Sequence, residues 1–215
     1  MISIIIEKYN SVRYGYLRWR SQLSVVWRLS LSLFMAFVTG LAAQVAFPLP
    51  WTPVPLTAQT LVVLLSGIVL GKWYGGLSQV LYVGIGVAGI PWFTGWSGGI
   101  SHLAGPTGGY ILGFIIAAIF VGHFTDNYSK SRNFFSIFFL MLIANFLFIH
   151  GFGILQLYLW LFLIKGAPVS FLKLMTMGTL PFTPGDIIKI ILVAILARGT
   201  LPERSMKDAN KFSSK

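Results

Sequence analysis

Residues 134–164 read FFSIFFLMLIANFLFIHGFGILQLYLWLFLI, a run without a single Asp, Glu, Lys or Arg. A helix of about 20 apolar residues crosses the ~30 Å hydrocarbon core of a bilayer, so this run is long enough to span it. Gly151 and Gly153 lie inside the run and offer a place where such a helix can bend. The stretch indicates an integral membrane protein.

The composition of the whole chain agrees with a lipid environment. Of its 215 residues 56% are hydrophobic and only 10% are charged, and the mean hydropathy is +0.80. A soluble domain has about 25% charged residues, because its surface must face water. We therefore predict an all-α integral membrane protein that forms one compact domain of six transmembrane helices. The predicted helices are 29–47, 57–71, 75–90, 107–124, 134–164 and 185–200.

The basic residues predict how the chain is oriented. The net charge is +11, and the basic residues lie in the tails and short connections, where they encode membrane topology rather than nucleic-acid binding. In a six-helix layout only Lys165 and Lys173 fall in outer loops, and Lys189 falls inside a helix. The other Lys and Arg residues are on the cytoplasmic side: Lys8, Arg13, Arg18, Arg20, Arg28, Lys72, Lys130, Arg132, Arg198, Arg204, Lys207, Lys211 and Lys215.

This bias predicts that both termini are cytoplasmic and that the protein is a multi-pass protein of the cytoplasmic membrane. Residues 1–28 are then a basic N-terminal cytoplasmic extension, 29–200 a substrate-binding membrane domain, and 201–215 a basic C-terminal tail. The partners expected from composition alone are membrane lipids and not nucleic acid.

The sequence carries no pattern of an enzyme. It has no cysteine, and its three histidines do not show the spacing of a metal site. A Walker A motif, an HExxH motif and a Ser-His-Asp arrangement are all missing, so any use of ATP requires another chain. We expect no catalytic residues, no metal and no cofactor.

Two outer connections have an unusual composition. Residues 47–56 contain four prolines, which restrict the backbone and make the segment stiff. Residues 90–109 are rich in glycine and aromatic residues, including Trp92, Gly98 and Gly99. Interfacial turns with an aromatic belt explain this composition, and a lid over a ligand pocket explains it equally well.

Asp186 and Lys189 form the most informative pair of charges. They lie three residues apart at the start of the last predicted helix, and therefore on one helical face. Ionisable groups at membrane depth are costly and mark sites. The alternative is an N-cap with a lysine that extends to the membrane interface. A carboxylate only accepts hydrogen bonds and an ammonium only donates them, so the pair suits a neutral ligand with N–H beside C=O.

Other polar residues on the predicted spans are expected to join helices by hydrogen bonds more often than they contact a ligand. Gln59 and Tyr82, near the outer ends of their helices, are the strongest candidates for ligand contacts, and Tyr110 is a further one. The others are Thr57, Ser78, Gln79, Asn145, His150 and Gln156.

The first predicted helix carries a stripe of small residues. Ser32, Ala36 and Gly40 are spaced by four, a pattern that allows another helix to approach closely. Spacing alone leaves open whether that helix belongs to this chain or to a partner subunit.

Three segments together resemble the BioY family, which comprises the biotin-binding S components of energy-coupling-factor (ECF) transporters. They are Pro53-Val-Pro-Leu-Thr-Ala-Gln-Thr60, Gly105-Pro-Thr-Gly-Gly-Tyr-Ile-Leu-Gly-Phe114 and Leu180-Pro-Phe-Thr-Pro-Gly-Asp-Ile-Ile-Lys189. The resemblance covers about 30–200 and leaves the N-terminal ~25 residues outside. It implies a six-helix S-component fold that holds biotin near the outer face, under the two outer connections.

The resemblance also implies roles for particular residues. Asp186 and Lys189 are expected to contact the ureido ring of biotin. The stripe of small residues resembles the AxxxA surface on which S components dock to a coupling protein, with Gly40 in place of the second alanine. Some relatives carry Arg in the glycine-rich connection, opposite the biotin carboxylate, where this sequence has Ser97.

The leading hypothesis is biotin capture and uptake, with a transmembrane coupling subunit and two ATP-binding subunits as partners. The candidate biotin contacts are Asp186, Lys189, Gln59, Tyr82, Trp92, Gly98, Gly99 and Tyr110. Two alternatives remain: an S component for another vitamin or a transporter without an energising module, and a structural membrane scaffold. A scaffold gives no reason to bury Asp186 with Lys189 beneath a glycine-rich loop.

Overall fold

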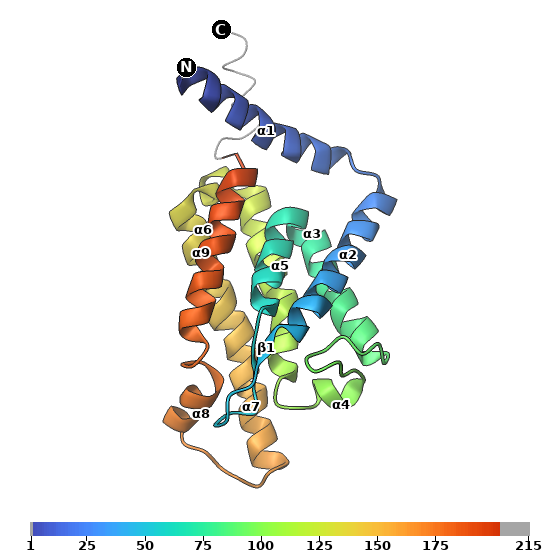
Figure 1. Ribbon diagram of the computed structural model, residues 1–215, viewed down its shortest axis with the longest axis vertical. Helices are drawn as coiled ribbons and strands as arrows, with labels where there is room; N and C mark the ends of the chain where they lie inside the picture. The colour runs from blue at the N-terminus through green and yellow to red at the C-terminus, as the bar shows by residue number, and fades with distance from the viewer. Residues whose placement is uncertain (1, 203–215) are drawn as a thin grey trace.

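Figure 1 shows the computed structural model, which describes residues 2–202, with side chains from residue 11 onward. The predicted C-terminal tail lies outside the described residues from position 203. The elements are α1 Ile2–Gln22, α2 Val25–Gln44, β1 Ala46–Phe47, β2 Leu56–Thr57, α3 Gln59–Val87, α4 Ile100–Leu103, α5 Gly108–Asn127, the 3₁₀ turn η1 Ser129–Arg132, α6 Phe134–Ile143, the π-helix η2 Ala144–His150, α7 Gly151–Leu163, α8 Phe171–Gly178 and α9 Thr183–Thr200.

The described residues are predominantly helical, and the long helices are apolar, as predicted. Four are long and apolar enough to cross a membrane, namely α2, α3, α5 and the continuous run Phe134–Leu163 formed by α6, η2 and α7. The pair α8 and α9, bent by 49°, makes a fifth if it counts as one span. The run 134–164 is thus one apolar helix, and it changes its helical pitch at η2 instead of breaking at Gly151.

Helix α3 is a hairpin of two helical limbs that reverses at Gly71. This residue has φ of 79° and ψ of −174°, a conformation open to glycine. Side chains on the two limbs meet: Gln59 Nε2 donates to Tyr82 Oη at 2.8 Å, and Gln79 Nε2 donates to Ser66 Oγ at 3.2 Å. In a straight helix, 23 residues would separate the first pair by about 35 Å. The limbs correspond to the separate helices predicted at 57–71 and 75–90.

Glycines allow the helices to approach closely around α5. A Cβ atom on Gly67 of α3 would lie 2.6 Å from the Ala118 carbonyl oxygen of α5. A Cβ atom on Gly113 of α5 would lie 2.6 Å from the Phe148 carbonyl oxygen of η2. Side chains at these positions would push the helices apart. The two glycines therefore allow α5 to pack in the centre, between α3 and the long run α6–η2–α7.

The stripe of small residues on α2 faces the interior of the chain. Ser32 and Ala36 have no exposed surface, and Gly40 is buried. Ser32 Oγ lies 3.1 Å from the carbonyl oxygen of Tyr74 on the second limb of α3, and a Cβ atom on Gly40 would lie 3.1 Å from Trp92. The prediction of a partner-docking surface at these three residues is therefore corrected, because a stripe covered by its own chain has no surface to offer a partner.

The predicted N-terminal extension is mostly helical. Helix α1 lies across one end of the bundle, and α2 begins at Val25, four residues earlier than expected (Figure 1). Arg13 Nε donates to the Leu201 carbonyl at 2.9 Å, Tyr16 Oη donates to the Val69 carbonyl at 2.5 Å, and Arg20 pairs with Asp126. Hydrogen bonds thus hold α1 against the ends of α9 and α5 and against the bend of α3.

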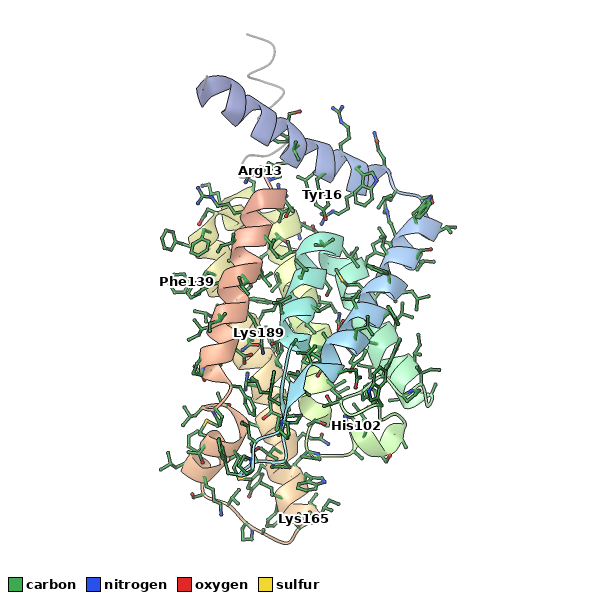
Figure 2. All side chains as sticks on the ribbon, viewed as in Figure 1. Arg13, Tyr16, His102, Phe139, Lys165 and Lys189 are labelled. Carbon is green, nitrogen blue, oxygen red and sulfur yellow. The ribbon has the colours of Figure 1, made fainter. Side chains whose placement is uncertain are left out.

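The two outer connections lie at the opposite end from α1, together with α4, α8 and the end of α7 (Figure 1). Side chains labelled in Figure 2 mark the two ends, Arg13 near α1 and Lys165 beyond α7. Residues 47–56 form a loop closed by the antiparallel pair β1–β2, in which Ala46 faces Thr57 and Phe47 faces Leu56. Among the described residues, these two short strands are the named exception to the predicted all-α fold.

Candidate solute-binding site

A cavity lies among the connections 47–56 and 90–109 and the ends of α3, α5 and α9, with η2 at its side. About 510 Å³ of space between atoms belongs to it, its open mouth included. The lining residues are Val54, Pro55, Leu56, Thr57, Gln59, Thr60, Thr94, Thr107, Tyr110, Ile111, Phe114, Ile149, His150, Phe182, Asp186 and Lys189. The wall is mostly apolar with a few converging polar groups, which is typical of a small-molecule site.

Asp186 is the polar centre of this wall. It lies in the first turn of α9 after Pro184, where the helix dipole favours a negative charge, and only 2% of the residue is exposed. Oδ1 accepts hydrogen bonds from Thr60 Oγ1 at 3.2 Å and Lys189 Nζ at 2.9 Å. Oδ2 lies 3.0 Å from Asn145 Nδ2 and 2.8 Å from His150 Nε2. All four lone-pair sites of the carboxylate are therefore occupied.

Lys189 is also fully hydrogen-bonded within the protein. Its ammonium donates to the Thr57 carbonyl at 2.6 Å and to Thr60 Oγ1 at 3.1 Å, in addition to Asp186. These three bonds use its three donors. The side chain is 15% exposed, more than the 3% of the Asp186 side chain. A ligand therefore meets Lys189 more readily than Asp186, and it must replace one of the existing bonds. Figure 2 shows Lys189 between the ends marked by Arg13 and Lys165.

The π-helix η2 brings two polar side chains to one oxygen of Asp186. Asn145 and His150 are five residues apart, which in an α-helix turns their side chains about 140° from each other. A π-helix bonds residue i to i+5 and so aligns them on one face. Both side chains consequently reach Oδ2 of Asp186. The irregular pitch of the long span thus has a direct consequence for the site.

Two of the candidate residues lie at the cavity wall with fixed orientations. Tyr110 donates from Oη to the Gly178 carbonyl at 2.8 Å. Gln59 donates to Tyr82 Oη and accepts from Thr57 Oγ1 at 3.0 Å. The structure thus brings Asp186, Lys189, Gln59 and Tyr110 together around one space.

The structure places the other candidates away from the cavity wall. Tyr82 is fully buried behind Gln59, and its ring contacts Trp92 and Phe93. Trp92 donates from Nε1 to the Tyr82 carbonyl at 2.9 Å and packs on α2. Neither Tyr82 nor Trp92 lines the cavity, because packing turns their rings inward. Both residues instead support Gln59 and the glycine-rich connection from behind the wall.

Gly98 and Gly99 serve the loop conformation and are also outside the wall. A Cβ atom on Gly98 would lie 2.7 Å from the Ile90 carbonyl oxygen. Gly99 has φ of 86°, and its N–H donates to the Gly86 carbonyl at 2.7 Å. Both residues allow the glycine-rich connection to fold against the end of α3.

Ser97, in the glycine-rich connection, belongs to a small network that holds this loop. Ser97 Oγ lies 2.8 Å from both the Thr94 carbonyl oxygen and His102 Nδ1. The other nitrogen of His102 lies 3.3 Å from Thr107 Oγ1. Burial lowers the pKa of His102, which favours its neutral form. Thr94 and Thr107 line the cavity, so this network shapes the mouth of the site.

Sequence reasoning did not single out Thr60, Asn145 and His150 for the site. Asn145 and His150 were noted only as polar residues within the apolar run 134–164, where a hydrogen bond between helices is the common explanation. They do form such bonds, but with the ionisable residue that marks the site. Two polar residues five apart in an otherwise apolar span are the signal that could have identified them.

A helical membrane protein with a largely apolar cavity, and a buried carboxylate–ammonium pair in its wall, is a binding protein for a small solute. The sequence profile described as the BioY family matches residues 18–205. The chain belongs to the BioY family. The match begins inside α1, so the part of the chain before it is shorter than the extension of ~25 residues expected from the resemblance.

Comparison with individual proteins agrees with this assignment. A probable biotin transporter BioY of Methanothermobacter thermautotrophicus is 48% identical over 139 residues, which cover 65% of this chain and 88% of the relative. A probable biotin transporter BioY of Pyrococcus horikoshii is 39% identical over 168 residues, covering 77% and 90%. The crystal structure of an S-component for biotin from an ECF-type ABC transporter matches with a TM-score of 0.70 and 27% identity, covering 80% of this chain and 89% of that one.

Proposed function

We propose that this protein binds biotin and takes part in its uptake as the S component of an ECF-type transporter. The observation that carries the proposal is the buried Asp186–Lys189 pair in the cavity wall of a chain that belongs to the BioY family. The relatives that bear a functional name are biotin transporters, and the similar crystal structure is an S-component for biotin. The protein is thus a transport component and not an enzyme.

The chemistry of the wall suits the ureido ring of biotin. This ring presents two N–H donors and one C=O acceptor, and the pair offers a carboxylate that accepts and an ammonium that donates. We assign Lys189 to the ring carbonyl and Asp186 to an N–H, each exchanging a bond that it now makes within the protein. Gln59 and Tyr110 complete the polar wall, while Leu56 and the other apolar lining residues cover the rest of the ligand.

The proposed topology has six crossings: α2, the two limbs of α3, α5, the run α6–η2–α7, and α9. Each limb of α3 is short for a ~30 Å core, as α9 is, so these segments depend on loops that reach into the membrane. Both ends of the described chain lie at the end that carries Arg13, and Lys165 lies at the other end (Figure 2). The distribution of basic residues supports a cytoplasmic position for both termini. Reporter fusions at each terminus test this, and an outer signal from either one contradicts the six-crossing layout.

Uptake requires energy that this chain does not supply. We propose that a transmembrane coupling subunit and two ATP-binding subunits are its partners in the cytoplasmic membrane. Since the stripe Ser32, Ala36 and Gly40 is covered, the docking surface must lie elsewhere on the chain. Co-purification with a tagged coupling subunit from the same organism tests the partnership.

The direct test of the function is biotin binding to the purified protein in detergent. We expect saturable binding of labelled biotin that unlabelled biotin displaces. Iminobiotin has a cyclic guanidine in place of the ureido group. It should bind more weakly in its protonated form, because a guanidinium offers no acceptor to Lys189 and repels its positive charge. Riboflavin and thiamine serve as the other-vitamin controls. Displacement by one of these and not by biotin would contradict the proposal and favour a different S component.

A further inference from the structure

A second cavity lies at the opposite end of the bundle, in the angle between α1 and α2. Its space between atoms, open mouth included, is about 1160 Å³. Helices α1, α2 and α3 meet around it, and Figure 1 shows α1 leaning away from α2 at this corner. Its lining includes two arginines, one carboxylate, several aromatic rings and an apolar strip, and biotin binding uses none of these residues.

Arg28 is the cation of this cavity that has no acidic partner among the described residues. Arg20 pairs with Asp126 Oδ1, and Asp126 Oδ2 accepts from the Lys72 backbone N–H at 2.8 Å, so that carboxylate is already engaged. Arg28 donates from Nη2 to the Ser21 carbonyl at 2.8 Å, and its guanidinium lies 5.6 Å from the centroid of the Tyr74 ring. Its Nε is buried and makes no hydrogen bond. Arg28 thus offers a positive charge that no carboxylate of the described residues balances, and a buried N–H donor, to an anionic ligand.

The wall next to Arg28 is apolar and runs along α2. Leu31, Phe34 and Met35 line the cavity within two helical turns of Arg28. Leu31 and Met35 follow Arg28 by three and seven residues on one helical face, and Phe34 follows Leu31 by three. Phe34 is 60% exposed, so this strip continues to the outer surface of the bundle. Trp19 and Trp73, which are 48% and 71% exposed, also line the cavity. Exposed tryptophans of this kind collect at the level of lipid headgroups.

We propose that this cavity binds an anionic phospholipid, with its phosphate on Arg28 and an acyl chain along Leu31, Phe34 and Met35. The guanidinium edge formed by Nε–H and Nη2 matches two oxygens of one phosphate. Basic pockets between helices at the cytoplasmic side are sites for anionic headgroups. The apolar strip begins one helical turn beyond Arg28 and can contact an acyl chain. A free anion has no apolar part to contact this strip, so the strip favours a lipid as the ligand.

The test measures lipid retention by native mass spectrometry of the delipidated protein, with phosphatidylglycerol as the probe and phosphatidylcholine as the zwitterionic control. We expect phosphatidylglycerol to be retained preferentially. Arg28→Gln should reduce its apparent affinity about fivefold to tenfold. The matched control is Arg18→Gln, which removes the same charge from an exposed position of α1 outside the cavity and should have less than about a twofold effect.

A second variant and a measurement of folding separate loss of the lipid site from loss of structure. Arg28→Lys keeps the charge but loses the planar fork, and should give an intermediate loss if the headgroup is held as proposed. Thermal unfolding in lipid-free detergent shows that each variant folds. Equal binding of the two lipids, or an equal loss in Arg18→Gln and Arg28→Gln, overturns the proposal. Inorganic phosphate or glycerophosphoglycerol that displaces the lipid at equal concentration also overturns it, because the acyl strip then contributes nothing.

Discussion

His150 is positioned by Asp186 on one side and by Gly178 on the other. Its Nε2 lies 2.8 Å from Asp186 Oδ2, and its Nδ1 lies 3.0 Å from the Gly178 carbonyl oxygen. A carbonyl oxygen only accepts, so Nδ1 carries a hydrogen. His150 thus connects the first turn of α9 to the end of α8 through its two ring nitrogens.

Asp186→Asn should weaken biotin binding by one to two decades. Hydrogen bonds to charged groups contribute about 1.5–3 kcal/mol, and about 1.4 kcal/mol corresponds to one decade. The new amide nitrogen would also face donors, since Thr60, Asn145 and Lys189 all donate to Asp186. Binding of labelled biotin measures the loss. Affinity equal to wild type would show that the carboxylate serves only the structure of the ligand-free protein.

Lys189→Met keeps most of the apolar stem and removes the three donors. We expect a similar loss of affinity, together with a lower melting temperature of the ligand-free protein, because Asp186 keeps its charge and loses a partner. The control is Lys173→Met on α8, where the lysine is exposed. If both variants bind biotin like wild type, Lys189 is a snorkelling lysine and the site assignment fails.

His150→Leu should destabilise the ligand-free protein by about 1.5–3 kcal/mol, because an acceptor on Asp186 and the Gly178 carbonyl both lose their partner. Chemical denaturation monitored by tryptophan fluorescence measures the change. His123→Leu is the matched control, since His123 bonds only within its own helix, to Asn127. Equal effects of the two substitutions would argue against a special role of His150.

Gly71→Ala tests the hairpin of α3. Gly71 has positive φ, and an added Cβ would lie within contact of the Asp126 carboxylate, so we expect a loss of at least about 1 kcal/mol. Gly84→Ala, in the same helix with no atom within 4 Å of the new Cβ, should instead be neutral or stabilising by about 0.5–1 kcal/mol. Melting temperatures of both variants decide this. A mild effect at Gly71 would mean that the chain does not reverse there.

The outer loop should lose stability below pH 6.5. The pKa of His102 is lowered by burial from its ordinary value of 6.5, so the unfolded chain takes up the proton first. The stabilisation that neutral His102 gives to the folded state is therefore fully present above pH 6.5. It decreases as the pH falls through 6.5 toward the pKa of His102 in the folded protein. His102→Gln should flatten the dependence of the melting temperature on pH between 7.5 and 5. An unchanged slope would contradict this assignment.

Much of the molecule follows from patterns along the chain. Apolar length predicted the membrane environment and the positions of the long helices, because hydrocarbon accepts only segments whose backbone is satisfied internally. The predicted layout has 57–71 and 75–90 as separate helices, and Gly71 is where the two limbs of α3 part. Asp186 and Lys189 were found because charges at membrane depth are rare and costly.

The tertiary structure decided which faces meet. The small residues of α2 suit any close helix approach, and only packing shows that Trp92 and the second limb of α3 occupy that side. Spacing could not assign Asn145 and His150 to Asp186, because they point apart in an α-helix and converge only in the π-helix η2. Periodicity along one chain defines a helix and its faces, but the partner of each face depends on contacts between residues far apart in sequence.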